Sequence, residues 1–344
     1  MTAPRILWQS ASPVLLEAER AGRLPKEANG GVAYEHHAVR GLQRSFEAVV
    51  DPEAVQRPGE SVYAYWARMR GHAPSRADLV VKDPKAVTFG RELRDVPTVA
   101  MIHHLDYTLR ESTVRHRIYM ARLLARLRRA DVVVTVSEYW RSELERVGCR
   151  RVEVIYNAFD PAEFDATPDA VAAFFAEHDL PTDRPLVYIG NASRIKGTAE
   201  VYEQLKDEGY TLVMSGRNND TGVPARWFCL ERPEYLLLLA ACDAVVCMSR
   251  LPEGWNRVAH EAMLCGTPVI GSGIAGMGEL LDGGQQTTLT DIGALPETVR
   301  HVLAHKDAFA ERGRAFTRQY DARYFEDAWA DLAHGLLAGV PSSL

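Results

Sequence analysis

Short apolar runs alternate with longer stretches of helical periodicity along the whole chain, and this alternation predicts βα units stacked into parallel sheets. The first half holds five such runs, which we expect to be strands: residues 6–8, 79–81, 99–102, 132–134 and 152–155. The second half repeats the scheme with four: residues 186–189, 212–214, 244–247 and 268–270. The pattern therefore predicts an α/β protein of two doubly wound domains, which also suits a chain of 344 residues.

The two predicted domains are joined near residue 160. A turn, N-A-F-D-P, occupies residues 157–161, and the stretch that follows to Pro185 carries the prolines and acidic residues of a connector. We therefore expect a first domain over 1–160 and a second over 161–319. Apolar residues at helical spacing over 315–337 predict one long terminal helix. We expect residues 320–344 to pack back on the first domain.

Charge and cysteine content exclude several classes of function. The net charge of -6 argues against a general nucleic-acid binder, so any anion site must be local. Five cysteines without a C-x-x-C pair indicate neither a disulfide framework nor a zinc cluster. The N-terminal region lacks the pattern of a signal peptide, and no run approaches the roughly 20 apolar residues of a spanning helix. These features favour a cytoplasmic protein with reduced thiols.

The most informative segment is E-G-W-N-R-V-A-H-E, residues 253–261, followed by A-M-L-C-G-T-P-V-I. If residues 254–256 form the entry turn of a helix, Glu253 precedes the helix and Glu261 lies two turns into it, on roughly the same face. The backbone N–H groups at that helix start, with the helix dipole, would hold a diphosphate without a metal, and Gly254 lets the backbone come close. A solvated amphipathic helix is the alternative explanation for two glutamates at this spacing.

This segment resembles the signature of glycosyltransferase family 4, the retaining "group 1" type with the GT-B fold, which reads E-G-F-G-x-x-x-x-E-A-M-x-x-G-T-P-V. The chain departs from it with Trp255 for phenylalanine and Asn256 for glycine, two positions at which the family uses mainly backbone contacts. The resemblance implies two Rossmann-like domains that face each other across a cleft and clamp a sugar nucleotide. It also implies that Glu261 accepts hydrogen bonds from the ribose hydroxyls and that Glu253 contacts the donor sugar.

A second segment of the donor domain, G-N-A-S-R-I-K-G at 190–197, is similar to the family's G-R-L-x-x-x-K-G loop. By that resemblance Lys196 faces the diphosphate and stabilises the departing nucleotide. Asn191 stands in place of the family's arginine, which removes a bidentate phosphate contact, and Arg194 is the candidate to replace it. Arg217 is a further candidate for contact with the nucleotide. For Lys196 and Arg217, ordinary surface residues remain the alternative.

Two segments of the first domain also resemble family positions. Gly30 and Gly31 open the first long helix after the first strand, where the family's loop approaches the donor phosphates and the acceptor. His103, in M-I-H-H-L-D at 101–106, is similar to the histidine of the family's T-x-H-D segment, near the donor sugar. We expect His103 to position the sugar or to handle the acceptor proton. A satisfied buried histidine is the alternative.

The segment 115–129 predicts an amphipathic helix that contacts anionic lipid at the inner face of the membrane. Its periodicity places four apolar residues on one face: Met120, Leu123, Leu124 and Leu127. Three arginines lie opposite: Arg122, Arg126 and Arg129. A solvated basic face over an ordinary core stripe is the alternative.

Together these features predict a retaining, metal-independent glycosyltransferase without a cofactor, which moves a sugar from a UDP or GDP sugar to a hydroxyl acceptor. Its partners would then be the sugar nucleotide and the acceptor, and no nucleic acid. A sugar-nucleotide epimerase of the same fold and a catalytically silent sugar-nucleotide binding protein are the alternatives. A nicotinamide dehydrogenase is disfavoured because no G-x-G-x-x-G follows the first strand. The identity of the nucleotide base, the sugar and the acceptor stays open.

Overall fold

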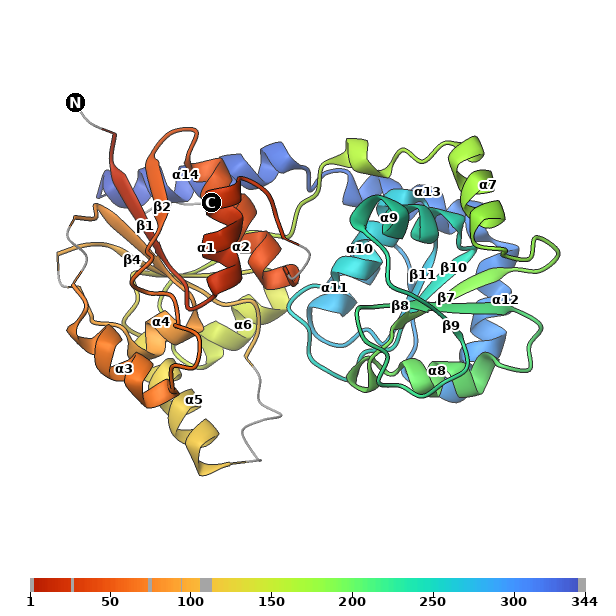
Figure 1. The fold of residues 1–344 in the computed structure, drawn as a ribbon, viewed down its shortest axis with the longest axis horizontal. Helices are drawn as coiled ribbons and strands as arrows, with labels where there is room; N and C mark the ends of the chain where they lie inside the picture. Colours follow the sequence, from red (N-terminus) through yellow and green to blue (C-terminus); the bar gives the residue numbers. More distant parts are fainter. Residues whose placement is uncertain (1–2, 26–27, 74–75, 94, 106–112, 340–344) are drawn as a thin grey trace. The chain divides into compact units, whose positions relative to one another are not determined.

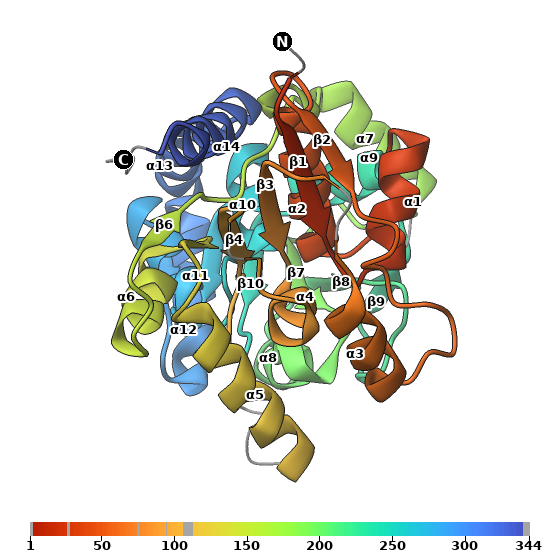
Figure 2. The same cartoon turned by 90° about the vertical axis from the view of Figure 1, so that its left-hand side faces the viewer.

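The computed structural model describes residues 3–25, 28–73, 76–93, 95–105 and 113–339. The chain divides into two compact units, one formed by Met1–Asn157 with Arg323–Leu344 and the other by Ala158–Ala322. Each unit is an open sheet of six parallel strands flanked by helices (Figures 1 and 2). The predicted fold class, α/β with two Rossmann-like domains, is confirmed.

The first unit has the strand order β2-β1-β3-β4-β5-β6, and every neighbouring pair is parallel. Its strands are β1 (Arg5–Gln9), β2 (Glu47–Val50), β3 (Leu79–Lys82), β4 (Thr98–Met101), β5 (Val132–Thr135) and β6 (Val152–Val154). The order reverses between β1 and β3, since β1 leads to the edge strand β2 and β3 leads the other way. Ligands of open α/β sheets bind outside the carboxyl ends of the strands at such a reversal.

Most helices of the first unit begin behind a polar side chain that accepts a hydrogen bond from the first turn, which is the usual reason why a helix starts at a given residue. These capping residues are Ser12, Asn29, Ser61, Asp83, Thr113 and Ser137. The helices that follow them are α1 (Pro13–Ala21), α2 (Gly30–Leu42), α3 (Val62–Gly71), α4 (Pro84–Phe89), α5 (Val114–Leu127) and α6 (Glu138–Arg146).

The C-terminal helix α14 (Ala322–Leu337) packs on the first unit, as the fold prediction has it. The rings of Trp329 and Trp8 have their centroids 5.2 Å apart, so α14 lies beside β1 (Figure 2). Phe325 meets the ring of Tyr34 edge-on at 4.8 Å. Such aromatic pairs bury large apolar surfaces, and the end of the chain is thereby part of the first unit's core.

The prediction of one long helix over 315–337 is wrong. Two helices, α13 (Lys306–Thr317) and α14, occupy this stretch. Between them, the carbonyl oxygen of Tyr320 accepts a hydrogen bond from the backbone N–H of Phe159 at 3.2 Å. Tyr320 packs in the second unit, whereas Trp329 packs in the first. The helical spacing of apolar residues therefore continues along the sequence although the helix itself is interrupted where the chain passes from one unit to the other.

The second unit has the strand order β12-β11-β10-β7-β8-β9. Its strands are β7 (Leu186–Asn191), β8 (Thr211–Ser215), β9 (Arg226–Phe228), β10 (Ala244–Cys247), β11 (Val269–Gly271) and β12 (Thr287–Thr288). Its helices of eight or more residues are α7 (Pro168–Glu177), α8 (Thr198–Leu205), α9 (Arg232–Ala241), α10 (Arg257–Cys265), α11 (Gly276–Gly283), α12 (Leu295–Ala304) and α13. The strand order here reverses between β7 and β10. Any ligand of this unit is therefore expected at the carboxyl ends of those two strands.

The amphipathic helix predicted at 115–129 is α5, but its arginines do not form the free basic face that the sequence predicts. Arg122 donates from Nε to the carbonyl oxygen of Thr88 at 2.7 Å. Arg126 and Arg129 both reach the carboxylate of Glu92, at 3.2 and 3.4 Å. These contacts fasten α5 to the end of α4 and the loop after it. The apolar stripe of α5 faces the core through Met120, Leu123 and Leu127. Among the described residues, no helix combines the length and apolar character needed to cross a bilayer.

A pair of buried carboxyl groups lies in the first unit. Glu35 of α2 accepts a hydrogen bond from Trp8 Nε1 at 2.8 Å. Burial, together with a smaller contribution from the nearby charge of Asp83, raises the pKa of Glu35 to about 8. Glu35 is therefore largely protonated at neutral pH in the folded protein, whereas it ionises at its ordinary pKa in the unfolded chain.

We predict that Glu35→Gln flattens the pH dependence of stability. Below pH 4 both states hold the proton and the native state keeps its full stability. Between pH 4 and about pH 8, Glu35 loses its proton in the unfolded chain but keeps it in the folded protein. The free energy of unfolding of the parent therefore falls as pH rises through this range. The loss should be on the order of 1 to 3 kcal/mol between pH 5 and pH 8. Urea denaturation at both pH values measures it. Glu17→Gln, at an exposed position of α1, is the control. An equal pH slope in Glu35→Gln and the parent would contradict the assignment.

Candidate active site

Two candidate residues of the second unit meet at the carboxyl ends of β7 and β10, where the strand order reverses. Lys196 lies in the short 3-10 helix that follows β7, and Glu253 lies in the loop that follows β10. Lys196 Nζ is 2.7 Å from Glu253 Oε1, and the two side chains are 33% and 12% exposed. The sequence places these residues at one ligand, and the structure joins them in a direct, partly buried ion pair.

The loop that holds Lys196 packs directly on the loop that follows β10. Gly197 has a left-handed backbone, with φ of +74°, and a Cβ atom there would lie 2.3 Å from the carbonyl oxygen of Met248. A side chain at this position would force the two loops apart. Glycine is therefore required next to Lys196 for the ion pair to form.

The helix α10 starts as the sequence predicts, with residues 254–256 at its entry. Asn256 is the capping residue, and its Oδ1 accepts from the backbone N–H of Ala259 at 2.8 Å. Trp255 is buried and donates from Nε1 to His260 Nδ1 at 3.0 Å. Burial lowers the pKa of His260 to about 3, so the ring is neutral and can accept this bond. Both side chains thus brace the helix start, and the cap already satisfies one backbone donor of the predicted anion cradle.

Glu261 lies in the second turn of α10 and is buried between two arginines. Its Oε1 accepts from Arg232 Nη1 at 3.0 Å and lies 3.9 Å from Arg257 Nη2. Arg232 also pairs with Glu163 at 2.7 Å, and the guanidinium of Arg257 lies 4.4 Å from the centroid of the Phe159 ring. Nothing in the local sequence of Arg232 links it to Glu261, so this partner could not be predicted, whereas Arg257 lies four residues before Glu261 in α10, a spacing that could have indicated the contact.

The other candidates of the second unit lie around the end of β7. Asn191 accepts from the hydroxyl of Tyr188 at 2.9 Å. Arg194 donates from Nε to the carbonyl oxygen of Asp220 at 2.7 Å, and so fastens the loop after β8. Arg217 is exposed on that same loop. The structure thus places all three at the same end of the sheet as Lys196.

The candidates of the first unit also lie together. Gly30 and Gly31 are the first residues of α2, as predicted. His103 follows β4, and a Cβ atom on Gly31 would lie 3.5 Å from Cδ2 and Nε2 of its ring. The ring of Tyr34 meets the His103 ring edge-on at 5.0 Å. His103 therefore sits against the start of α2, whereas Asp106 of the same motif lies outside the described residues.

Within the described ranges, no three or more histidines, cysteines, aspartates or glutamates gather in a group that could hold a metal ion. The carboxylates of the site are instead paired with cationic side chains. Glu253 pairs with Lys196, and Glu261 with Arg232.

Comparison with known proteins gives the family. The model of Glycosyltransferase Family 4 matches residues 23–163, and the model of Glycosyl transferases group 1 matches residues 186–305. A glycogen synthase of Mycobacterium tuberculosis is 26% identical over 317 residues, which cover 76% of this chain and 73% of that protein. Sucrose-phosphate synthase from Thermosynechococcus elongatus has the same fold, with a TM-score of 0.77 and 18% identity over 98% of this chain and 100% of the other. HepE of Anabaena, in complex with UDP-glucose, gives a TM-score of 0.68 and 19% identity over 96% and 99%. The chain therefore belongs to glycosyltransferase family 4, with the GT-B fold, and is a glycosyltransferase.

Proposed function

We propose that the protein is a retaining, metal-independent glycosyltransferase that uses a nucleoside diphosphate sugar, of the UDP or GDP type, and a hydroxyl acceptor. The observation that carries this proposal is the ion pair of Lys196 and Glu253 at the reversal of the second sheet. The fold shared with HepE, which binds UDP-glucose, supports a UDP sugar as the donor.

The ion pair offers two groups that suit two parts of one ligand. The Lys196 ammonium suits the diphosphate, which gains negative charge as its bond to the sugar breaks. The Glu253 carboxylate suits the hydroxyls of the sugar, because a charged acceptor makes strong hydrogen bonds. Donor binding would exchange the ion pair for these two contacts, so that one step fixes the phosphate and the sugar together.

The nucleotide would extend from this point to Glu261. Arg232 and Arg257 approach Oε1 of this carboxylate, and we assign Oε2 to the ribose hydroxyls. The backbone of residues 254–256 would approach the phosphates, since the side chains of Trp255 and Asn256 turn inward to brace the helix.

Retention follows if the acceptor attacks from the face that the diphosphate leaves. The bond from the acceptor oxygen to the anomeric carbon forms as the bond to the phosphate oxygen breaks. The departing phosphate takes the acceptor proton, so no base from the protein is needed. In this scheme Lys196 stabilises the phosphate charge, and His103 positions the donor sugar.

Turnover of sugar nucleotides tests the function. In a panel of UDP and GDP sugars, we expect the purified protein to hydrolyse at least one donor slowly or to transfer its sugar to an acceptor. The rates should be unchanged after EDTA treatment and dialysis. NMR of the first-formed product should show the anomeric configuration of the donor. Loss of activity with EDTA that added magnesium restores would contradict metal independence, and an inverted product would contradict retention.

Separate variants of the ion pair test the two assigned roles. Lys196→Ala should weaken UDP binding about tenfold and lower turnover at least about a hundredfold, because it removes the cation at the diphosphate. Glu253→Gln should leave UDP binding equal or tighter, since it frees the lysine, while turnover falls. Calorimetry with UDP and donor turnover measure both. Lys206→Gln, at the exposed lysine that follows the last residue of α8, is the control. Parent-like turnover in either site variant would remove that residue from the mechanism.

A second partner is suggested by exposed apolar side chains at the start of α3 and α5. Tyr63 is 62% exposed, Val114 71% and Ile118 64%. The guanidinium of Arg115 lies 5.6 Å from the centroid of the Tyr63 ring, so a side chain of the first turn of α5 reaches one of the first turn of α3. Exposed apolar groups beside an arginine suit the surface of an anionic bilayer. We propose peripheral lipid contact here rather than through the arginines that hold α4.

Vesicle binding tests this surface. Ile118→Glu should abolish co-sedimentation with vesicles of anionic lipid, because it places a carboxylate in the contact. The parent should co-sediment with anionic vesicles and should not co-sediment with zwitterionic vesicles. Ala21→Glu, at an exposed position of α1, adds the same charge elsewhere and should bind like the parent. Equal sedimentation of both variants, or none for the parent, would exclude this docking mode.

A further inference from the structure

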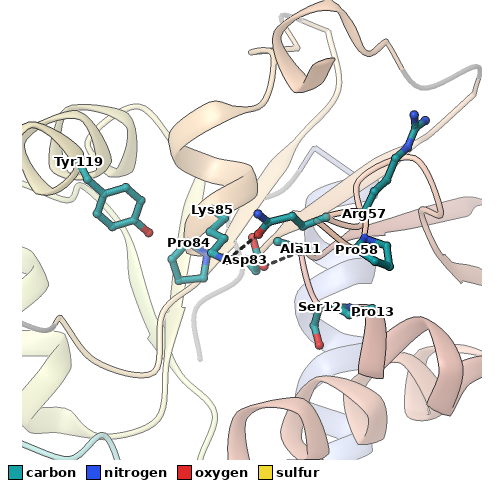
Figure 3. Close-up of a pocket in the computed structure, with 10 residues that line it drawn as sticks. Ala11, Ser12, Pro13, Arg57, Pro58, Asp83, Pro84, Lys85 and Tyr119 are labelled. Carbon is teal, nitrogen blue, oxygen red and sulfur yellow. Dashed lines mark hydrogen bonds between the residues drawn. The ribbon is translucent and has the colours of Figure 1, made fainter. Parts of the chain in front are cut away.

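A cavity of about 710 Å³ opens in the first unit (Figure 3). Its walls come from the segments that follow β1, β2 and β3: two loops supply Ser12 and Gln56, and the first turn of α4 supplies Lys85. Tyr119 of α5 completes the wall. These loops meet at the reversal of the strand order, where ligands of open α/β sheets bind. The volume lies in the range of small-molecule sites. Topology and size together mark the cavity as a binding site separate from the residues assigned to the donor.

The wall between β1 and β3 is held by one buried carboxyl group. Asp83 Oδ2 accepts from the backbone N–H of Ala11 at 2.7 Å and from Ser10 Oγ at 3.2 Å. Its Oδ1 accepts from the backbone N–H of Ala86 at 2.6 Å. Both oxygens are thus engaged by donors of the protein itself. Asp83 therefore shapes the cavity and does not serve as a hydrogen-bond acceptor for a ligand.

The cationic group of this cavity is Lys85. Its Nζ lies 3.0 Å from Gln56 Oε1, a neutral amide oxygen. Arg57 also lies at the rim, but its guanidinium turns away from Lys85 and is 3.3 Å from Glu53 (Figure 3). The hydroxyl of Tyr119 points toward Lys85 (Figure 3). An ammonium group whose hydrogen bond goes to a neutral amide is stabilised more by a hydrogen bond to an oxyanion than by one to a neutral hydroxyl.

We propose that this cavity binds the acceptor and that the acceptor carries an oxyanion, a phosphate or a carboxylate, which pairs with Lys85. The oxyanion displaces the amide of Gln56 from the ammonium. That amide and the Tyr119 hydroxyl then contact the hydroxyls of the same ligand. The assignment of this ligand as the sugar acceptor rests on the proposed function, whereas the binding of an oxyanion at Lys85 does not.

Calorimetry on the full chain without donor tests the proposal. The probes are glucose 6-phosphate, glucuronate and glucose, which share a ring and differ in charge. At least one anionic probe should bind about fivefold or more tightly than glucose, and Lys85→Gln should reduce that preference to less than about twofold. Lys206→Gln removes the same charge at the C-terminal end of α8 and should keep the preference. The better of the two anionic probes identifies phosphate or carboxylate as the group.

The outcomes separate this proposal from the proposed function. UDP is titrated into the same variants, and Lys85→Gln should bind it like the parent. A Lys85-dependent preference for anions in a protein that neither binds UDP nor turns over donors would sustain the cavity and overturn the proposed reaction. No binding of any probe, equal binding of charged and neutral probes, or a preference that survives Lys85→Gln would overturn the oxyanion site.

Discussion

The contact on which the proposed donor site depends is the ion pair between Lys196 and Glu253. It joins the loops after β7 and β10, and Gly197 allows the two loops to touch. Each charge compensates the other, so neither is left unpaired in a partly buried position without ligand. A ligand that supplies only an anion would pair with Lys196 and leave the Glu253 carboxylate without a partner. A ligand that supplies only hydroxyl groups would bind Glu253 and leave the Lys196 ammonium without a partner. The pair therefore favours a ligand with both a phosphate and hydroxyl groups.

The two sheets use the same topological position in different electrostatic ways. In the second unit, the lysine at the reversal is neutralised by a carboxylate. In the first unit, the buried acid Asp83 is engaged by backbone N–H groups and interacts with Lys85 through its charge, while the hydrogen bond of Lys85 Nζ goes to the amide oxygen of Gln56. The first site thus keeps a positive charge toward its cavity in a chain whose net charge is -6. Binding there requires no exchange of an ion pair, but Lys85 is exposed to solvent, which screens its charge, so weak, reversible occupancy is expected.

The sequence predicts this fold wherever strands are buried on both faces, because such strands are continuous apolar runs like that of β5. The edge strand β2 escaped prediction because only alternate residues are buried and it begins with the exposed Glu47, so it is not a continuous apolar run. The strands β9 and β12 escaped because Arg226–Phe228 and Thr287–Thr288 are short and largely polar or exposed. Among site residues, those within one loop or helix turn are readable from local motifs. Arg232 is not, since it meets Glu261 across 29 positions through the packing of α9 on α10. The pairing of Lys196 with Glu253 likewise depends on the order of strands.

The replacement of the family's arginine by Asn191 illustrates the same limit. From the sequence it reads as the loss of a phosphate contact, yet the structure gives the asparagine a part in a hydrogen-bond chain. The Tyr188 hydroxyl donates to Asn191 Oδ1 and lies 2.8 Å from Ser215 Oγ, so Ser215 must donate to Tyr188. Arginine has donors only and could not accept from Tyr188. With Arg194 bound to the Asp220 carbonyl, the proposed function leaves compensation of a diphosphate charge at the end of β7 chiefly to Lys196.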